Sequence, residues 1–335
     1  MAMLIVIKCA AIVESILRGP SIMRPSILMT RQLDARDTSL NKFLDALDQD
    51  AFVITTELTP PKGTDLSGLF DKADMLKERV TAFNLTESHA ARMAMDPVAV
   101  GRLLLDRGLE PIVQMTSRDK NRIAIQASML GAAALGIRNL VFMGGDPPKN
   151  GDHPDAKPVF DMFASQLLEA ALALNSGTDF MGNALNAPTH FCVGAVVNPG
   201  AADIATEIEN AHRKADAGAS FFQTQAIYDT DSYLRFMDAA KLSQPVLAGI
   251  IPIKSVKMAK YMNEKIPGVD IPEVLVERIG AAGEDTKRVA KISIEIAAAT
   301  INQLKGFCRG VHIMAIGWED KIPSILDSSG VPPSP

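Results

Sequence analysis

The sequence predicts a single (β/α)8 barrel, or TIM barrel, and three observations support this fold. The chain has 335 residues, a length typical of one such barrel with insertions. Hydrophobic residues make up 47% and charged residues 22%, so a large core can form. After residue 40, eight short apolar runs alternate with helical patterns. An open doubly wound sheet is the competing architecture, but no Gly-x-Gly-x-x-Gly follows a strand.

The eight apolar runs are the expected barrel strands. They are rich in Val, Ile or Phe and lack strict polar alternation, as do parallel strands that are buried on both faces. In chain order they are Phe52–Glu57, Thr81–Thr86, Pro111–Thr116, Asn139–Gly144, Phe191–Val197, Ser220–Gln225, Val246–Ile251 and Val311–Ile316.

Helical periodicity between these runs predicts amphipathic helices. The clearest cover Asn121–Leu135, Ala202–Ala217 and Glu284–Leu304. In the first of them, the apolar face comprises Ile123, Ala127, Leu130 and Ala134. Two longer loops, Asp146–Pro158 and Ser176–Pro188, are expected in the connection between the fourth and fifth strands.

The barrel is expected to span residues 39–328, with an N-terminal segment before it and a short tail after it. Residues 1–38 are expected to be poorly ordered, and residues 329–335 form the tail. The apolar run Met1–Leu17 contains Lys8 and is too short and too interrupted to span a bilayer. It also lacks the charge order of a signal peptide, although a targeting segment remains the alternative.

Charge and cysteine content exclude several classes of function. The net charge is −5 and no Lys/Arg-rich block stands out, so a nucleic-acid partner is not expected. Three cysteines form no CxxC pair and no HExxH occurs, so neither a metal site nor a disulfide framework is indicated. This pattern is typical of the reducing cytoplasm, and no membrane association is expected.

Polar residues at the ends of the expected strands are the candidate site, because barrel enzymes carry their chemistry at that end. These residues are Glu57, Thr86, Gln114, Asp146 and Gln225. Two carboxylates on different strands suit an acid and an electrostatic partner. The alternative is that such residues only cap the barrel and bind water.

Residues that flank two of these positions suggest chemistry of their own. Leu58 and two prolines beside Glu57 should desolvate its carboxyl and raise its pKa toward neutrality. Gly144 and Gly145 would let the backbone approach a flat or phosphorylated ligand closely, unless they only form a tight turn. His153 is a weaker candidate for an acid.

The same segments resemble methylenetetrahydrofolate reductases. Residues 56–61 read TELTPP, residues 143–148 read MGGDPP, and residues 214–219 read KADAGA, followed by QTQ at residues 223–225. The resemblance covers roughly Ser39 to Leu326, and some features are closer to a branch found beside corrinoid one-carbon pathways. Some members of that branch are thought to work with a partner subunit.

The resemblance implies a flavoprotein that reduces 5,10-methylenetetrahydrofolate to 5-methyltetrahydrofolate, or runs the reverse reaction, in one-carbon metabolism and methionine biosynthesis. Glu57 would be the general acid, Asp146 would tune the flavin and Gln225 would bind the pterin. FAD is the expected cofactor, with FMN as the alternative and NAD(P)H as the electron donor. Either a homo-oligomer or an electron-transfer partner subunit is expected. Flavin-binding positions carried over from the family are Thr86, Gln114, Gly144, Gly145, Asp146, Phe163, Ala164, Asn198, Glu207 and Lys214.

Departures from the better-known branch leave a second function open. Gly144 replaces an Arg, Gln114 replaces a His and Asn198 replaces another His, so flavin contacts are lost. The alternative is a non-catalytic or flavin-free folate-binding subunit of a multi-protein one-carbon complex.

Overall fold

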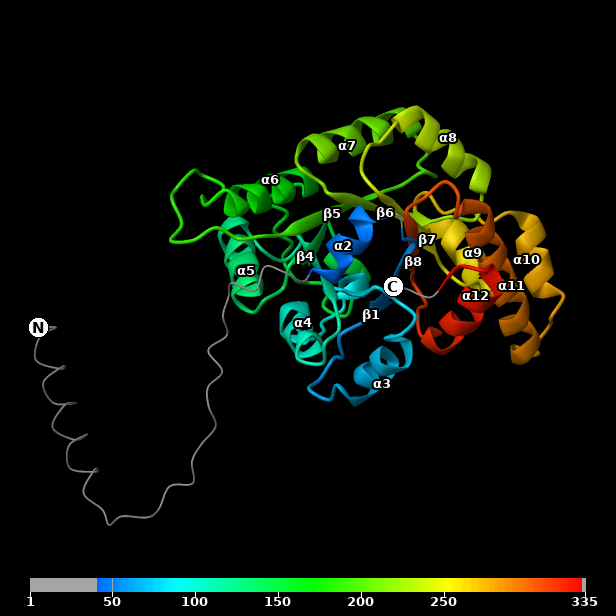
Figure 1. Ribbon diagram of the computed structural model, residues 1–335. Helices are drawn as coiled ribbons and strands as arrows, with labels where there is room; N and C mark the ends of the chain where they lie inside the picture. The colour runs from blue at the N-terminus through cyan, green and yellow to red at the C-terminus, as the bar shows by residue number, and fades with distance from the viewer. Residues whose placement is uncertain (1–40, 50, 333–335) are drawn as a thin grey trace, which may run out of the picture. The chain divides into compact units, whose positions relative to one another are not determined.

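The structure, a computed structural model, describes residues 41–49 and 51–332 (Figure 1). The expectation that residues 1–38 are poorly ordered lies outside the described residues. The last helix, α12 (Ile322–Ser329), ends one residue beyond the predicted barrel boundary, and Gly330 follows it in the left-handed conformation.

Eight parallel strands close into one barrel in chain order, which confirms the predicted fold. The strands are β1 (Val53–Leu58), β2 (Ala82–Leu85), β3 (Pro111–Thr116), β4 (Asn139–Met143), β5 (Cys192–Val197), β6 (Phe221–Ala226), β7 (Val246–Ile250) and β8 (Gly310–Ile313). The eighth strand is shorter than predicted, since Ile316 has a φ of 49° and so cannot continue an extended strand.

Helices surround the strands, as Figure 1 shows. They are α3 (Ser67–Leu76), α4 (Pro97–Leu105), α5 (Arg122–Ala134), α6 (Ala164–Asn175), α7 (Ile204–Asp216), α8 (Thr230–Ala240), α9 (Val256–Lys265), α10 (Glu273–Gly280) and α11 (Thr286–Leu304). Both predicted loops are present on either side of α6, and the first contains a short 3₁₀ turn, η2 (Pro148–Asn150).

One helix closes the N-terminal end of the barrel. In α2 (Lys42–Asp48), Phe43, Ala46 and Leu47 are buried against the first residues of the strands. The ring of Phe43 meets that of Phe221 edge-on, with centroids 4.9 Å apart. The amino-acid pattern did not reveal this short helix. Because α2 fills this end, a ligand must enter from the C-terminal ends of the strands.

The predicted apolar face of α5 was wrong. Ile123 is 76% exposed and Leu130 is 38% exposed, whereas Ile125, Met129 and Ala132 pack into the core. The helix carries apolar residues on almost every side, so its periodicity fits two faces equally well. The packing of α5 on the barrel selects the face that the spacing alone could not.

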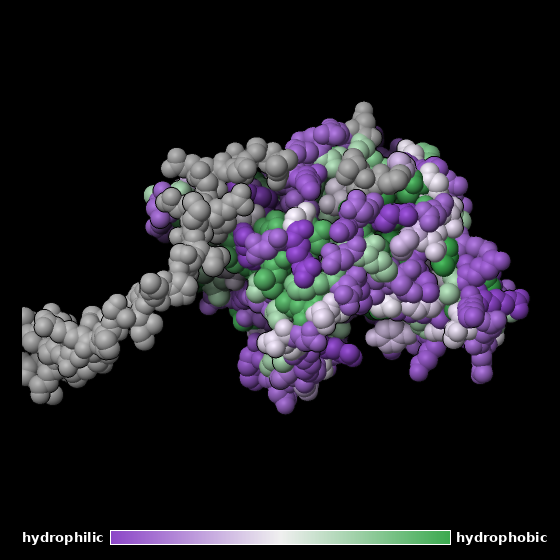
Figure 2. All heavy atoms as spheres, turned by 60° about the horizontal axis from the view of Figure 1, so that its bottom comes forward, coloured by the Kyte–Doolittle hydropathy of each residue, from purple (hydrophilic) through white to green (hydrophobic). Residues whose placement is uncertain are grey.

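The outer surface combines a hydrophilic rim with local apolar areas. On the face shown in Figure 2, hydrophobic residues gather near the middle and hydrophilic residues border them. Within the described residues, no helix combines the length and the apolar character that a membrane crossing requires.

Candidate functional site

The C-terminal ends of the strands gather the predicted site residues at one end of the barrel. Glu57 is the fifth residue of β1, Gln225 is the fifth of β6, and Asp146 follows β4 by three residues. All strands run in the same direction, so the three residues lie at the same mouth. This placement confirms the architectural prediction for Glu57, Asp146 and Gln225.

Side chains from two other strands lie against the Glu57 carboxyl. The amide Nε2 of Gln114 on β3 donates to Glu57 Oε1 at 3.0 Å. The ring nitrogen Nε2 of His312 on β8 lies 3.7 Å from the same oxygen. Only 17% of the Glu57 side chain is exposed, so these contacts act in a poorly solvated space.

The expected upward shift of the Glu57 pKa was wrong. Burial is the largest single effect and raises its pKa, but the interaction with His312 is the largest of the opposing effects. The charge of His89 and the hydrogen bond from Gln114 add to this effect, and the pKa ends below its usual value. The prolines and Leu58 supply desolvation, as predicted, whereas the basic partners come from distant parts of the chain. The protein therefore stabilises the carboxylate form of Glu57.

The loop after β4 places Asp146 at the surface of the mouth. Gly145 has a φ of 87°, a conformation that favours glycine, and a Cβ there would press on Thr116 and Arg118. A Cβ on Gly144 would meet open space, which leaves room for a ligand beside the backbone. Arg118, 3% exposed, donates from Nη1 to the carbonyl of Asp146 at 3.3 Å and so fixes this loop.

Two predicted cofactor positions carry buried oxygens that have no hydrogen-bond partner among the described residues. They are Thr86 Oγ1, just after β2, and Asn198 Oδ1, just after β5. An unpaired buried polar atom costs about 1–3 kcal/mol. Both atoms therefore have hydrogen-bonding capacity that a ligand could use.

Lys214 and Glu207, both on α7, make internal contacts. The ammonium of Lys214 donates to the carbonyl of Val196 at 2.7 Å, and Glu207 Oε1 accepts from the backbone N–H of Asn198 at 2.8 Å. Burial lowers the pKa of Lys214, and the charge of Glu207 partly offsets this effect. These contacts bring both residues to the end of β5, where they support the loop that carries Asn198.

The remaining predicted positions differ in exposure. Phe163 is 78% exposed and caps the N-terminus of α6, where Ala164 is the first helical residue. Gln225 is partly buried, and its Oε1 accepts from the N–H of Ala226 at 2.9 Å. Its side-chain NH₂ is the group that remains for a ligand. Gln114, predicted as a cofactor contact, instead directs its amide to Glu57.

A buried acidic residue next to Thr86 was missed. Glu87, 8% exposed, accepts from the N–H of Thr116 at 2.5 Å and pairs with the ammonium of Lys120 at 2.5 Å. It ties the ends of β2 and β3 together. Its position directly after a predicted strand was the available signal.

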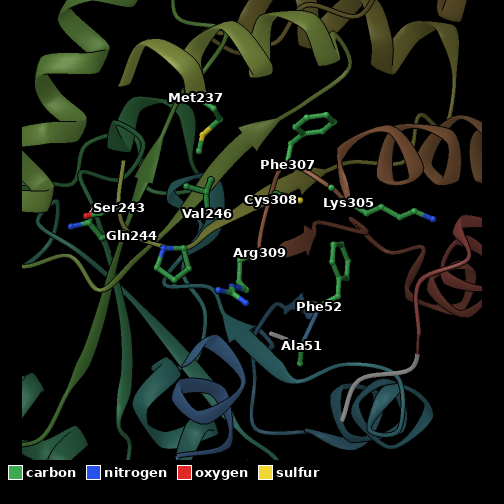
Figure 3. A pocket seen from close by; sticks show the side chains of 12 residues that line it. Ala51, Phe52, Met237, Ser243, Gln244, Val246, Lys305, Phe307, Cys308 and Arg309 are labelled. Atoms are coloured by element: carbon green, nitrogen blue, oxygen red, sulfur yellow. Dashed lines mark hydrogen bonds between the residues drawn. The ribbon is translucent and has the colours of Figure 1, made fainter. Parts of the chain in front are cut away.

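A hollow at the opposite end of the barrel is not the site. Its volume is about 540 Å³, and residues at the beginnings of β7 and β8 line it, with Phe52, Phe307 and Arg309 around it in Figure 3. The thiol of Cys308 is its candidate nucleophile, but burial raises its pKa to about 11. None of the predicted site residues lines this hollow. Across residues 41–49 and 51–332, no cluster of His, Cys, Asp and Glu is arranged to hold a metal ion.

Comparison with solved structures agrees on the fold. An uncharacterised protein from Clostridium thermocellum, described as binding two copies of 5-methyl-5,6,7,8-tetrahydrofolic acid, superposes with a TM-score of 0.56 at 15% identity. The match covers 85% of this chain and 97% of that one. An EDTA monooxygenase from Chelativorans sp. BNC1 matches with a TM-score of 0.52 at 14% identity, over 84% of this chain and 94% of that one.

Sequence comparison identifies the family. 5,10-Methylenetetrahydrofolate reductase of Escherichia coli is 24% identical over 92% of this chain and 99% of its own length. Methylenetetrahydrofolate reductase 2 of Schizosaccharomyces pombe is also 24% identical, over 87% of this chain. The chain spans about half the length of the fungal relatives, 48% in that case. The methylenetetrahydrofolate reductase family model matches residues 42–330, from the helix that closes one end of the barrel to the last helix of its wall, and the chain belongs to this family.

Proposed function

We propose that the protein reduces 5,10-methylenetetrahydrofolate to 5-methyltetrahydrofolate, or catalyses the reverse reaction, with a bound flavin. The observation that carries the proposal is the placement of Glu57. A largely buried carboxyl that accepts from Gln114, lies 3.7 Å from an imidazole nitrogen and stands at the open end of a barrel of this family is suited to proton transfer.

The mouth has features that fit a flavin. Thr86 Oγ1 and Asn198 Oδ1 are buried without a partner among the described residues, and the space beside Gly144 is open. Thr86, Gly144, Gly145, Asp146, Phe163, Ala164, Asn198, Glu207 and Lys214 would hold the cofactor, as FAD or as FMN. When bound, the flavin supplies the hydride, with electrons from NAD(P)H or from a partner subunit.

The chain's own part in the reaction is acid catalysis and orientation. The imidazolidine ring of the folate must open to an electrophilic iminium before it can accept a hydride. Glu57 donates a proton to a ring nitrogen and opens the ring, while the NH₂ of Gln225 donates to the pterin. Asp146 is exposed at the same mouth, and its carboxylate would set the local charge beside a bound flavin.

An absorption spectrum of the purified protein, followed by extraction and identification of the cofactor, tests the proposal. A flavin spectrum that 5,10-methylenetetrahydrofolate or 5-methyltetrahydrofolate alters is expected. Protein that binds folate without any flavin, and shows no reductase activity when FAD is added, contradicts it.

A flavin-free or non-catalytic folate-binding subunit is the second candidate. The internal contacts of Lys214 with Val196 and of Glu207 with Asn198 favour it, because these two side chains are already engaged. The same spectrum separates the two candidates, and direct transfer from NAD(P)H to folate in colourless protein would support a flavin-free reductase.

A further inference from the structure

A chain of buried polar side chains crosses the barrel interior beneath Glu57. We call it the core relay, and it consists of Asn84, Gln223, Thr55 and His312, each at most 3% exposed. Asn84 and Gln223 exchange amide hydrogen bonds of 2.9 and 3.2 Å. Gln223 Nε2 also lies 3.5 Å from Thr55 Oγ1, which in turn lies 2.9 Å from His312 Nδ1. Such a polar network inside a barrel core is costly unless each group is satisfied.

The relay holds the His312 ring through one of its two nitrogens. The amide nitrogen of Gln223 faces Thr55 and donates to Oγ1 at 3.5 Å. The Thr55 hydroxyl in turn forms a 2.9 Å hydrogen bond with Nδ1 of His312. With Nδ1 engaged by Thr55, the second ring nitrogen, Nε2, is the one directed toward the mouth.

That nitrogen faces the proposed acid. Thr55 pairs with His312 across β1 and β8, and Glu57 lies two residues beyond Thr55, on the same side of β1. His312 Nε2 is 3.7 Å from Glu57 Oε1, the oxygen that also accepts from Gln114. The Gln114 amide and the His312 ring thus both lie against Oε1, and Oε2 is the oxygen left for the substrate.

We propose that His312 is a positioning residue for Glu57, which keeps Oε1 as the hydrogen-bond acceptor and places the transferable proton on Oε2. The proposal rests on the proposed role of Glu57 as the acid. In the step, the Oε2–H bond breaks and its electron pair stays on Oε2, while an N–H bond forms on the folate. The proton returns to Oε2 from solvent, and the Gln114 amide and the nearby His312 ring stabilise the carboxylate in between.

The titratable groups that act on Glu57 come from two elements. His312 belongs to β8, and His89 belongs to the short 3₁₀ turn η1 (His89–Ala91) after β2. Both lower the pKa of Glu57 against the effect of burial. His89 is exposed, whereas His312 is held within the relay, so the geometry assigns the fixed contact to His312.

Titration of the Glu57 carboxyl by infrared difference spectroscopy tests the proposal without relying on activity. The band that disappears in Glu57→Gln identifies the group. In His312→Leu, which removes the donor, Glu57 should titrate about one pH unit higher. His312→Gln keeps an N–H near the position of Nε2 and should titrate close to the native protein. The pH above which folate turnover declines should move in parallel, and turnover at its optimum should fall about tenfold in His312→Leu.

Thr55→Val extends the test to a variant that keeps the imidazole. Loss of the hydroxyl removes the hydrogen bond that holds Nδ1, so the ring is less firmly directed at Glu57. The Glu57 carboxyl should again titrate higher, although by less than in His312→Leu. This variant decides the matter if His312→Leu does not fold, as judged by thermal melting.

An unchanged Glu57 titration in His312→Leu, or in Thr55→Val where the first variant does not fold, overturns the proposal. The proposed function fails in a different way. If the titration shifts as expected but Glu57→Gln retains full folate turnover, His312 positions Glu57 and another group is the acid.

Discussion

The amide of Gln114 on β3 donates a 3.0 Å hydrogen bond to Glu57 on β1, although β2 lies between these two strands in the barrel. Both side chains reach into the mouth from their strand ends. The sequence resemblance assigned Gln114 to the cofactor, whereas the structure joins it to the carboxyl. Glu57 and the side chains nearest its carboxyl therefore come from three strands, β1, β3 and β8.

Glu57→Gln should abolish folate turnover and leave cofactor reduction intact. The amide keeps the shape of the side chain and an oxygen that can accept from Gln114, but it cannot donate the acid proton. A loss of about 10²- to 10⁴-fold is expected for the folate half-reaction. Stopped-flow measurement of each half-reaction checks this, since reduction of a bound flavin by NAD(P)H needs no acid at the folate.

Glu110→Gln is the matched control, because Glu110 precedes β3 and so lies at the closed end of the barrel. It should leave both half-reactions unchanged. If Glu57→Gln reduces folate at the native rate, the acid lies elsewhere, and His153 on the β4–β5 connection is the next residue to test.

Thr86→Val should stabilise the cofactor-free protein and weaken flavin binding. The hydroxyl of Thr86 is buried and has no partner among the described residues. Its replacement by a methyl group removes that penalty, so the free energy of unfolding should rise by about 1–3 kcal/mol. Chemical denaturation of the flavin-free protein and flavin titration measure the two effects.

Thr116→Val provides the opposite case on the neighbouring strand. The Thr116 hydroxyl donates to Glu87 at 2.9 Å, so its loss should destabilise the protein by about 1 kcal/mol. Equal losses of stability in both variants would show that Thr86 has a partner in solution.

Much of the fold was predictable because its signals are local. Each buried strand is a short apolar run, and parallel strands joined by helices have few ways to close. Pro111–Thr116 was predicted with its observed bounds. The early end of the eighth strand was not predictable. Ile316 has a left-handed backbone, and nothing about a β-branched residue indicates that conformation.

The support of the site was less predictable because it depends on contacts between distant residues. His312 and Thr55 are 257 positions apart, and only the register of β8 against β1 brings the imidazole to Glu57. Local sequence showed the desolvation of Glu57 but not the basic groups that reverse its effect on the pKa. The prediction of the buried face of α5 was wrong for a related reason, since the neighbouring elements decide which of its two apolar sides is covered.

Lys214→Ala should reduce the amount of flavin retained without unfolding the protein. Lys214 is the one cation among the predicted cofactor positions, its ammonium lies at the end of β5, and it can serve a phosphate as a point charge with three donors. Loss of its bond to Val196 should cost about 1 kcal/mol of stability. Flavin content after gel filtration and thermal melting check the two expectations.

Lys214→Met separates charge from packing, because it keeps an unbranched apolar stem. It should lose flavin as Lys214→Ala does, yet melt closer to the native protein. If both variants retain the native flavin content, the cofactor does not use this cation.

Glu110 should make the stability of the barrel depend on pH. Burial raises its pKa to about 7, although hydrogen bonding from Asn139 and the charge of Lys42 oppose this and the charge of Asp45 adds to it. The folded-state pKa lies above the ordinary value of 4.5, so the folded protein favours the protonated form. The contribution to stability is therefore complete below about pH 4.5 and is lost as the pH rises through about 7.

Glu110→Gln should remove this dependence, because an amide oxygen can still accept the 2.6 Å hydrogen bond from Asn139 but does not ionise. The rise from 4.5 to about 7 corresponds to at most about 3.4 kcal/mol. The free energy of unfolding, measured by denaturant titration between pH 5 and about 8, should fall with rising pH more steeply in the native protein than in the variant. Glu169→Gln, at an exposed position of α6, should leave the native slope unchanged. Parallel curves for the native protein and Glu110→Gln would show that the Glu110 carboxyl ionises as readily in the folded chain as in the unfolded one.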